Sequence, residues 1–170
     1  MTSADVLIDA YERVREQVRS ATRGLNKDQL AHRVDPDANS IAWLVWHLTR
    51  VQDDHIADAA GSEQLWTADG WVDEFRLPLE PHDTGFGHTS EQVAAVRASA
   101  NLLTSYHDAV HDRTAAYISG LTDDDLDQVI DDSWDPPVTL GVRLVSVIGD
   151  GMQHAGQAAF VRGIIKREKR

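Results

Sequence analysis

The chain has 170 residues, of which 42% are hydrophobic and 26% charged, and we expect a single domain over residues 1–170 because this length supports one core. Its formal net charge of −12 at pH 7 disfavours nucleic acid and anionic membrane surfaces as partners. With no cysteine, the chain lacks disulfides and thiol ligands, and with no signal sequence or membrane-length apolar stretch we expect a cytoplasmic protein.

Two amphipathic helices are predicted in the first third of the chain. Apolar residues recur at helical spacing over residues 3–24, with charged residues between them. A second helical pattern begins after Ser40, which suits an N-cap, and continues to about residue 60. Trp43 and Trp46 make this second helix apolar nearly all round, so we expect it at the centre of the fold.

A long connection precedes the third predicted helix. Residues 62–88 carry scattered aromatic side chains among glycines and prolines, which is typical of an irregular segment. Thr89 and Gln92 then have the spacing of a capping box, in which each side chain satisfies a backbone N–H of the other residue. Apolar residues on one stripe extend this third helix to about Gly120.

The last part of the chain predicts one short turn of helix and one long helix. Thr122 and Asp125 have the spacing of a second capping box, and the prolines of residues 135–137 interrupt the chain. A helical pattern then covers residues 139–166. Residues 127–130 are a weak strand candidate, and we expect no strand there. Four long amphipathic helices with long crossover connections predict an all-α fold, a four-helix bundle.

Asp150 and His154 form the first candidate site. They are four residues apart on the last predicted helix, so both side chains project from one face and can chelate a single divalent cation. Gln157 follows on the same stripe. Spacing alone leaves two interpretations open, a metal site or a plain hydrogen bond between carboxylate and imidazole inside the bundle.

His47 favours the metal interpretation. It lies in the most apolar predicted helix, where an imidazole is not expected to be fully solvated. Taken alone it is a core histidine with a satisfied hydrogen bond. Together with Asp150 and His154 it offers two nitrogens and one oxygen, a set that holds Zn²⁺, Fe²⁺, Ni²⁺ or Mn²⁺ and leaves positions open for water or substrate.

The other histidines have simpler interpretations. We expect His32 and His82 in solvent and His55 at the surface or its boundary. His107 and His111 have helix-chelating spacing. We interpret His107 as a boundary residue that pairs with an aspartate nearby in sequence, and the alternative is a group that contacts the substrate near the metal.

The sequence resembles the DinB-like (damage-inducible protein) family of four-helix bundles. The segments that carry the resemblance are Ser40-Ile-Ala-Trp-Leu-Val-Trp-His47-Leu and His154-Ala-Gly-Gln157. The family is related to the mycothiol-dependent maleylpyruvate isomerases and the bacillithiol transferases. The resemblance implies that His47 is the first metal ligand and that Asp150 and His154 are the other two. The commoner family pattern has histidine at the position of Asp150, whereas the mycothiol-dependent isomerase branch has an acidic residue there.

The resemblance also implies a function. It implies an S-transferase or isomerase that uses a low-molecular-weight thiol, such as mycothiol, on small electrophiles, with a divalent ion, zinc first, lowering the pKa of the thiol. Gln157 or Gln153 then orients the bound thiol or electrophile, and a homodimer is expected. The alternatives are a metal-binding bundle without catalysis and a metal-free helical interaction module.

His88 lies in a segment, Asp83-Thr-Gly-Phe-Gly-His88, that resembles one common in actinobacterial-type members of this family. It precedes a predicted helix N-terminus, where backbone N–H groups favour anions. One interpretation is a contact with a substrate carboxylate, and the interpretation we prefer is a flexible loop.

Overall fold

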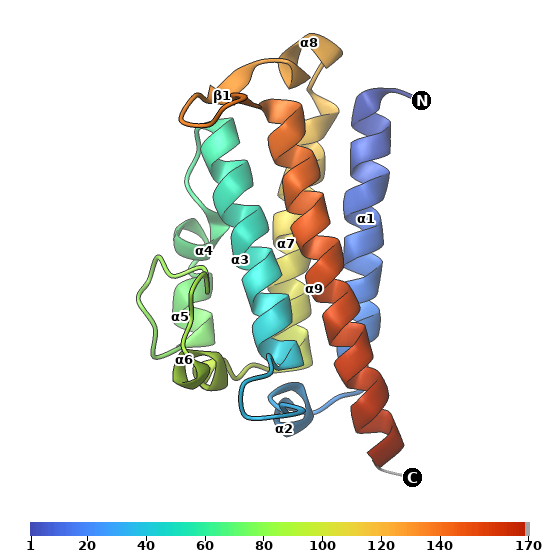
Figure 1. Cartoon of the computed structure of the whole chain (residues 1–170), viewed down its shortest axis with the longest axis vertical. Coiled ribbons are helices and arrows are strands. Elements are labelled where there is room, and N and C mark those ends of the chain that lie inside the picture. The colour runs from blue at the N-terminus through green and yellow to red at the C-terminus, as the bar shows by residue number, and fades with distance from the viewer. Residues whose placement is uncertain (169–170) are drawn as a thin grey trace.

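Four long helices form the body of the molecule (Figure 1): α1 (Ser3–Thr22), α3 (Ile41–Ala60), α7 (Ala100–Ser119) and α9 (Leu140–Glu168). In this computed structural model, which describes residues 1–168, α1 and α9 run in one direction and α3 and α7 in the other. Both α1 and α3 pack against α7 and α9, so α1 and α3 lie at opposite corners of the bundle. The predicted helical bundle is confirmed.

The helix α3 is buried along most of its length, as its tryptophans predict. The hydroxyl of Ser40 caps its start by accepting the N–H of Trp43 (3.1 Å), and Gly61 ends it in the left-handed conformation. Every side chain from 41 to 50 is buried, and Trp46 is only 1% exposed. Because α7, α9 and the crossover segment surround α3, polar side chains in this buried stretch, such as His47 and Arg50, are withdrawn from water.

The crossover segment, residues 61–99, returns along the bundle because α3 and α7 run in the same direction (Figure 1). It contains three short helices: α4 (Leu65–Ala68), α5 (Trp71–Phe75) and α6 (Ser90–Ala95). The rings of Trp66 and Phe75 are buried and pack on Tyr106 of α7, with ring centroids 5.3 and 5.8 Å apart. These aromatic contacts attach the crossover segment to the bundle.

The third predicted helix, over 89–120, is in fact two helices, α6 and α7. The capping box of Thr89 and Gln92 begins α6 as predicted, but the backbone is extended at Val96 (φ −78°, ψ 98°). The side chain of Val96 is buried there, and Ser99 caps a new helix by accepting the N–H of Leu102 (3.2 Å). The apolar spacing continues through this break, which is why the sequence pattern indicates one helix.

The remaining short elements are α2 (Lys27–Leu30), α8 (Asp123–Leu126), β1 (Val129–Asp131) and β2 (Val138–Thr139). The capping box of Thr122 and Asp125 begins α8, as predicted. The strands β1 and β2 pair antiparallel, so the expectation of no strand at 127–130 is wrong. Strands of three and two residues are too short for an alternating pattern to reveal them in the sequence.

The buried face of α9 differs in part from the predicted one. Ala159 is exposed, whereas Ala158 and Val161 are buried. An α-helix has 3.6 residues per turn, so repeated steps of four residues move around the helix and away from the core. Among the helices of residues 1–168, none has the length and apolar character that a membrane crossing requires.

Candidate metal centre

His47 of α3 and the pair Asp150 and His154 of α9 lie together, so the two helices bring all three predicted ligands to one place. One nitrogen of each histidine and one oxygen of the carboxylate lie within 4.8 Å of one another. The two imidazole rings meet edge to face, with centroids 4.9 Å apart. We call these three residues the ligand cluster.

The close packing of α9 against its neighbours positions the carboxylate. Asp150 Oδ1 is 3.4 Å from His154 Nε2, one helical turn further along α9. The residue after Asp150 is Gly151, where a Cβ atom would lie 3.2 Å from Cγ1 of Val14 on α1. A larger side chain at this position would push α9 away from α1 and move the carboxylate with it.

The tautomer of His47 is set by a backbone carbonyl. Nδ1 of His47 lies 2.5 Å from the carbonyl oxygen of Thr84. A carbonyl only accepts hydrogen bonds, so Nδ1 carries the proton and the lone pair of Nε2 is available to a metal ion. Burial lowers the pKa of His47, which favours this neutral form.

A glycine allows the loop that carries Thr84 to approach His47 closely. Gly85 follows Thr84 and has a φ of +93°, a value that other residues rarely adopt. A Cβ atom at Gly85 would lie 2.8 Å from Nδ1 of His47 and 3.0 Å from the ring of Trp46. Both the backbone conformation and the space therefore require glycine here.

The same loop is fastened to α3 at Asp83 and His88. The carboxylate of Asp83 accepts the N–H of Gly85 (2.9 Å) and lies 2.9 Å from Nε2 of His88. Nδ1 of His88 accepts the indole N–H of Trp43 (3.0 Å), and the ring stacks on Trp46. Burial raises the pKa of Asp83, but these hydrogen bonds outweigh burial and leave it below its ordinary value. The preferred prediction that His88 lies in a flexible loop is therefore wrong.

His154 is oriented from its own helix. Nδ1 of His154 donates to the amide oxygen of Gln157 (3.0 Å), one turn further along α9. The hydrogen bond with Asp150 raises the pKa of His154, because the carboxylate favours the protonated ring. Gln157 thus contacts a residue of the ligand cluster, and its contact with a cofactor stays a prediction.

The residues present fit a divalent metal ion. Oδ2 of Asp150 is buried and has no hydrogen-bond partner among the described residues. A buried carboxylate oxygen without a partner is costly, and a cation in the ligand cluster would satisfy it. Two imidazole nitrogens and one carboxylate oxygen are also a donor set that zinc and its neighbours accept.

The remaining histidines lie outside the ligand cluster. His107 is fully buried, and its Nδ1 donates to the hydroxyl of Thr49 on α3 (3.1 Å). His111 is buried beside Glu12 of α1, with Nε2 2.9 Å from the carboxylate. Both residues face neighbouring helices, so the prediction of a boundary position for His107 is wrong.

The three histidines expected near the surface differ in burial. His82 is exposed, as predicted, and His32 is half-buried. His55 is half-buried, and its Nδ1 accepts a hydrogen bond from the guanidinium of Arg143 (3.0 Å). This position agrees with the boundary expectation for His55.

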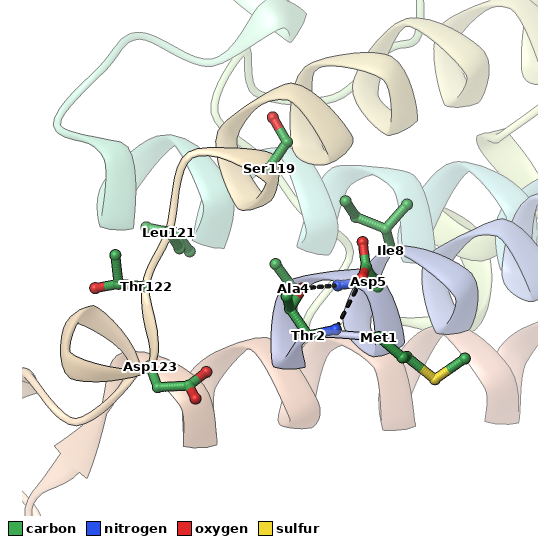
Figure 2. Close-up of a pocket in the computed structure, with 9 residues that line it drawn as sticks. All are labelled: Met1, Thr2, Ala4, Asp5, Ile8, Ser119, Leu121, Thr122 and Asp123. Atoms are coloured by element: carbon green, nitrogen blue, oxygen red, sulfur yellow. Dashed lines mark hydrogen bonds between the residues drawn. The ribbon is translucent and has the colours of Figure 1, made fainter.

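A hollow of about 560 Å³ lies at the end of the bundle where α1 begins (Figure 2). The start of α1 and the connection from α7 to α8 line it. Its carboxylate at Asp5 is already engaged, because it accepts the backbone N–H of Thr2 (2.8 Å) in the capping box of α1. The hollow therefore contributes nothing to the ligand cluster.

Comparisons with known proteins match the whole bundle. The model of a family described as mycothiol-S-transferase, a DinB-like family, matches residues 6–167. Among solved structures, the chain is similar to a conserved protein from Enterococcus faecalis, with a TM-score of 0.91 and 31% identity over 97% of this chain and 98% of that one. No curated protein matches. The resemblance to DinB-like proteins is confirmed.

Proposed function

Because the chain belongs to the mycothiol S-transferase family, we propose that it transfers the sulfur of a mycothiol-type thiol to small electrophiles. In this proposal, His47, Asp150 and His154 hold a divalent metal ion, with zinc as the first candidate. The observation that carries the proposal is the convergence of the three ligand atoms within 4.8 Å from two separate helices. The second form of this activity is an isomerase, in which the same thiol first adds to the substrate.

A bound divalent ion would lower the pKa of a coordinated thiol and so supply a thiolate near neutral pH. The chain has no cysteine, so the sulfur comes from the co-substrate. In a transfer, a bond forms between this sulfur and the electrophilic carbon. The leaving group departs with its electron pair, and the thiol proton passes to solvent.

The chain's own residues position the reactants and restrict water. The carbonyl of Thr84 keeps Nε2 of His47 unprotonated and directed away from the loop. The ring of Trp43 stacks on His47, with centroids 4.5 Å apart, and meets His154 edge-on. This ring covers one side of the ligand cluster with apolar surface, which strengthens electrostatic interactions there.

Metal content tests the first part of the proposal. Elemental analysis of the wild-type protein after zinc supplementation should find bound metal, and His47→Ala and His154→Ala should each lose it. His82→Ala removes an exposed histidine outside the ligand cluster and should bind as the wild type does. A wild-type protein that binds no metal would overturn the proposal and leave the metal-free interaction module.

Thiol consumption tests the second part. Loss of monobromobimane should depend on an added thiol and should be fastest with mycothiol when mycothiol, bacillithiol and glutathione are compared. Asp150→Ala should abolish most of this activity. Metal binding without thiol consumption would favour the alternative, a metal-binding bundle without catalysis.

We further propose a cytoplasmic homodimer. Val142 and Val145 are exposed on α9, and this apolar surface supports pairing of two copies. Light scattering coupled to size-exclusion chromatography measures the mass in solution, and a monomeric mass would contradict the proposal.

A further inference from the structure

A pocket of about 530 Å³ adjoins the ligand cluster. One of its walls is the face of α9 that carries Gln157, whose amide bonds His154 of the cluster. Its other wall is the segment 37–39, which precedes α3, and the buried side chain of Leu44 lies between the two. This volume is within the range of small-molecule sites.

The lining combines an aromatic face with polar groups that are not cationic. The ring of Phe160 is 67% exposed, although it belongs to the helix that carries the cluster. Asp37 contributes a carboxylate, and the half-buried amide of Asn39 makes no hydrogen bond to the other described residues. Among the described residues, the lining includes neither lysine nor arginine.

The loop wall is held in place by its own contacts. The guanidinium of Arg33 donates to the carbonyl of Ala38 (2.5 Å) and to Ser90 (3.0 Å). The hydroxyl of Ser90 donates to the carbonyl of Pro36 (2.8 Å). The guanidinium of Arg33, the cation near this loop, thus already donates its hydrogen bonds to backbone and hydroxyl oxygens. The wall is fixed before a ligand arrives, so less ordering is needed on binding.

On the basis of the proposed function, we propose that this pocket binds the neutral, hydroxyl-rich sugar portion of the thiol while its sulfur reaches the ligand cluster. The face of Phe160 attracts the polarised C–H groups of a sugar ring, because the face of an aromatic ring carries partial negative charge. The carboxylate of Asp37 accepts hydroxyl protons, and the amide of Asn39 both donates and accepts.

The same lining discriminates between thiols by charge. Mycothiol carries its cysteine in amide linkage to sugars and has no carboxylate, whereas glutathione and bacillithiol are anionic. Next to Asp37, and with no cationic side chain in the described lining, a carboxylate of the ligand meets repulsion and no partner. The pocket therefore selects a neutral thiol with many hydroxyl groups.

The experiment compares two neutral thiols, mycothiol and N-acetylcysteamine, which has no sugar. Both are reacted with monobromobimane on the zinc-loaded full chain, and the ratio of their kcat/KM values is measured. We expect Phe160→Ala and Asn39→Ala to lower this ratio by roughly tenfold. Trp134→Ala, which removes an aromatic side chain of similar exposure (66%) outside the pocket, should leave the ratio unchanged.

Two further variants test the pocket without shortening a side chain. A Cβ atom at Gly156, which lines the pocket, meets no atom within 4 Å, so Gly156→Leu places a bulky side chain at the pocket from an unobstructed position and should also lower the ratio. Asp37→Lys should narrow the preference for mycothiol over glutathione. Titration of the cobalt-loaded protein with each thiol, followed by its absorbance, measures binding apart from turnover.

The outcomes separate the two proposals. Ratios equal to the wild-type value in all pocket variants, with metal content retained, would overturn the sugar subsite and leave the proposed function standing. Equal kcat/KM values of the wild type for glutathione and mycothiol would also overturn the sugar subsite and leave the proposed function standing. A metal-loaded wild type that consumes no thiol would overturn the proposed function itself, and the sugar subsite with it.

Discussion

At the scale of single residues, the approach of Gly85 to His47 limits which side chains the loop can carry. Gly85→Ala places a Cβ atom 2.8 Å from Nδ1 of His47, so the loop must move and the bond from His47 to Thr84 weakens. Removing a group that hydrogen-bonds the non-coordinating ring nitrogen of a metal-bound histidine lowers metal affinity by about 10–100-fold, and we expect Gly85→Ala to lower zinc affinity by a factor in this range. Competition with a chromophoric zinc chelator measures it.

Gly87→Ala is the matched control for this prediction. Gly87 also has a positive φ, +72°, but a Cβ atom there meets nothing within 4 Å. The control therefore carries a similar backbone strain, of about 1 kcal/mol, without the contact to His47. Equal zinc affinities for the two variants would show that the approach of Gly85 does not position the histidine.

The contrast between His47 and Thr84 explains how much of the candidate centre the sequence can predict. His47, Asp150 and His154 are identifiable because imidazole and carboxylate groups are rare in apolar helices. Thr84 acts through its carbonyl oxygen, which every residue possesses, so its side chain gives no signal. The role of Gly85 depends on a tertiary contact with α3, and in the sequence it looks like any glycine of an exposed turn.

At the scale of helices, the contact between α9 and α1 next to Asp150 can be tested with two glycines of one helix. Gly149→Ala meets no atom within 4 Å and should stabilise the protein by about 0.5–1 kcal/mol, because alanine favours the helix. Gly151→Ala gains the same propensity but presses on Val14, which is buried and cannot withdraw easily. We expect it to be less stable than Gly149→Ala by about 1 kcal/mol or more.

Urea unfolding of the two variants without metal measures this difference. Zinc affinity gives a second reading, because displacement of α9 at Gly151 moves the carboxylate of Asp150. The prediction would be wrong if both alanine variants gained the same stability and kept wild-type zinc affinity.

Helix boundaries also show where sequence periodicity is and is not informative. The bounds of α1 and α3 agree with their patterns because capping residues coincide with the ends of the apolar stripes. The break between α6 and α7 does not interrupt its stripe, because Val96 stays buried in an extended conformation. Periodicity records which side chains are buried, and a short extended segment can bury a residue as well as a helix does.

At the scale of the whole molecule, a layer of polar side chains between α1, α3 and α7 makes the stability of the fold depend on pH. This layer contains Arg15, Thr49, His107 and Asp108. His107 lies in this layer and is fully buried, and burial lowers its pKa to about 3. Burial is the largest cause of this lowered pKa; the neighbouring His111 and the guanidinium groups of Arg15 and Arg19 contribute to it, whereas Asp108 opposes it, and the value of about 3 includes all of these effects. The folded protein therefore keeps His107 neutral in mild acid.

The sign of the pH effect follows from this shift. In the unfolded chain His107 has its ordinary pKa of about 6.5, so the unfolded state takes up the proton first as the pH falls. The stability from a neutral His107 is complete above pH 6.5 and is lost progressively as the pH falls from 6.5 towards 3. One such group changes the free energy of unfolding by up to about 1.4 kcal/mol per pH unit.

His107→Gln isolates this contribution. Glutamine retains a donor for the hydroxyl of Thr49 but does not titrate, so the variant should lose stability less steeply than the wild type between pH 6.5 and 4. Urea unfolding in the presence of EDTA measures both proteins without any metal contribution. His82→Gln removes an exposed histidine and should follow the wild-type profile. Parallel profiles for His107→Gln and the wild type would mean that His107 is charged in the folded protein or reaches solvent.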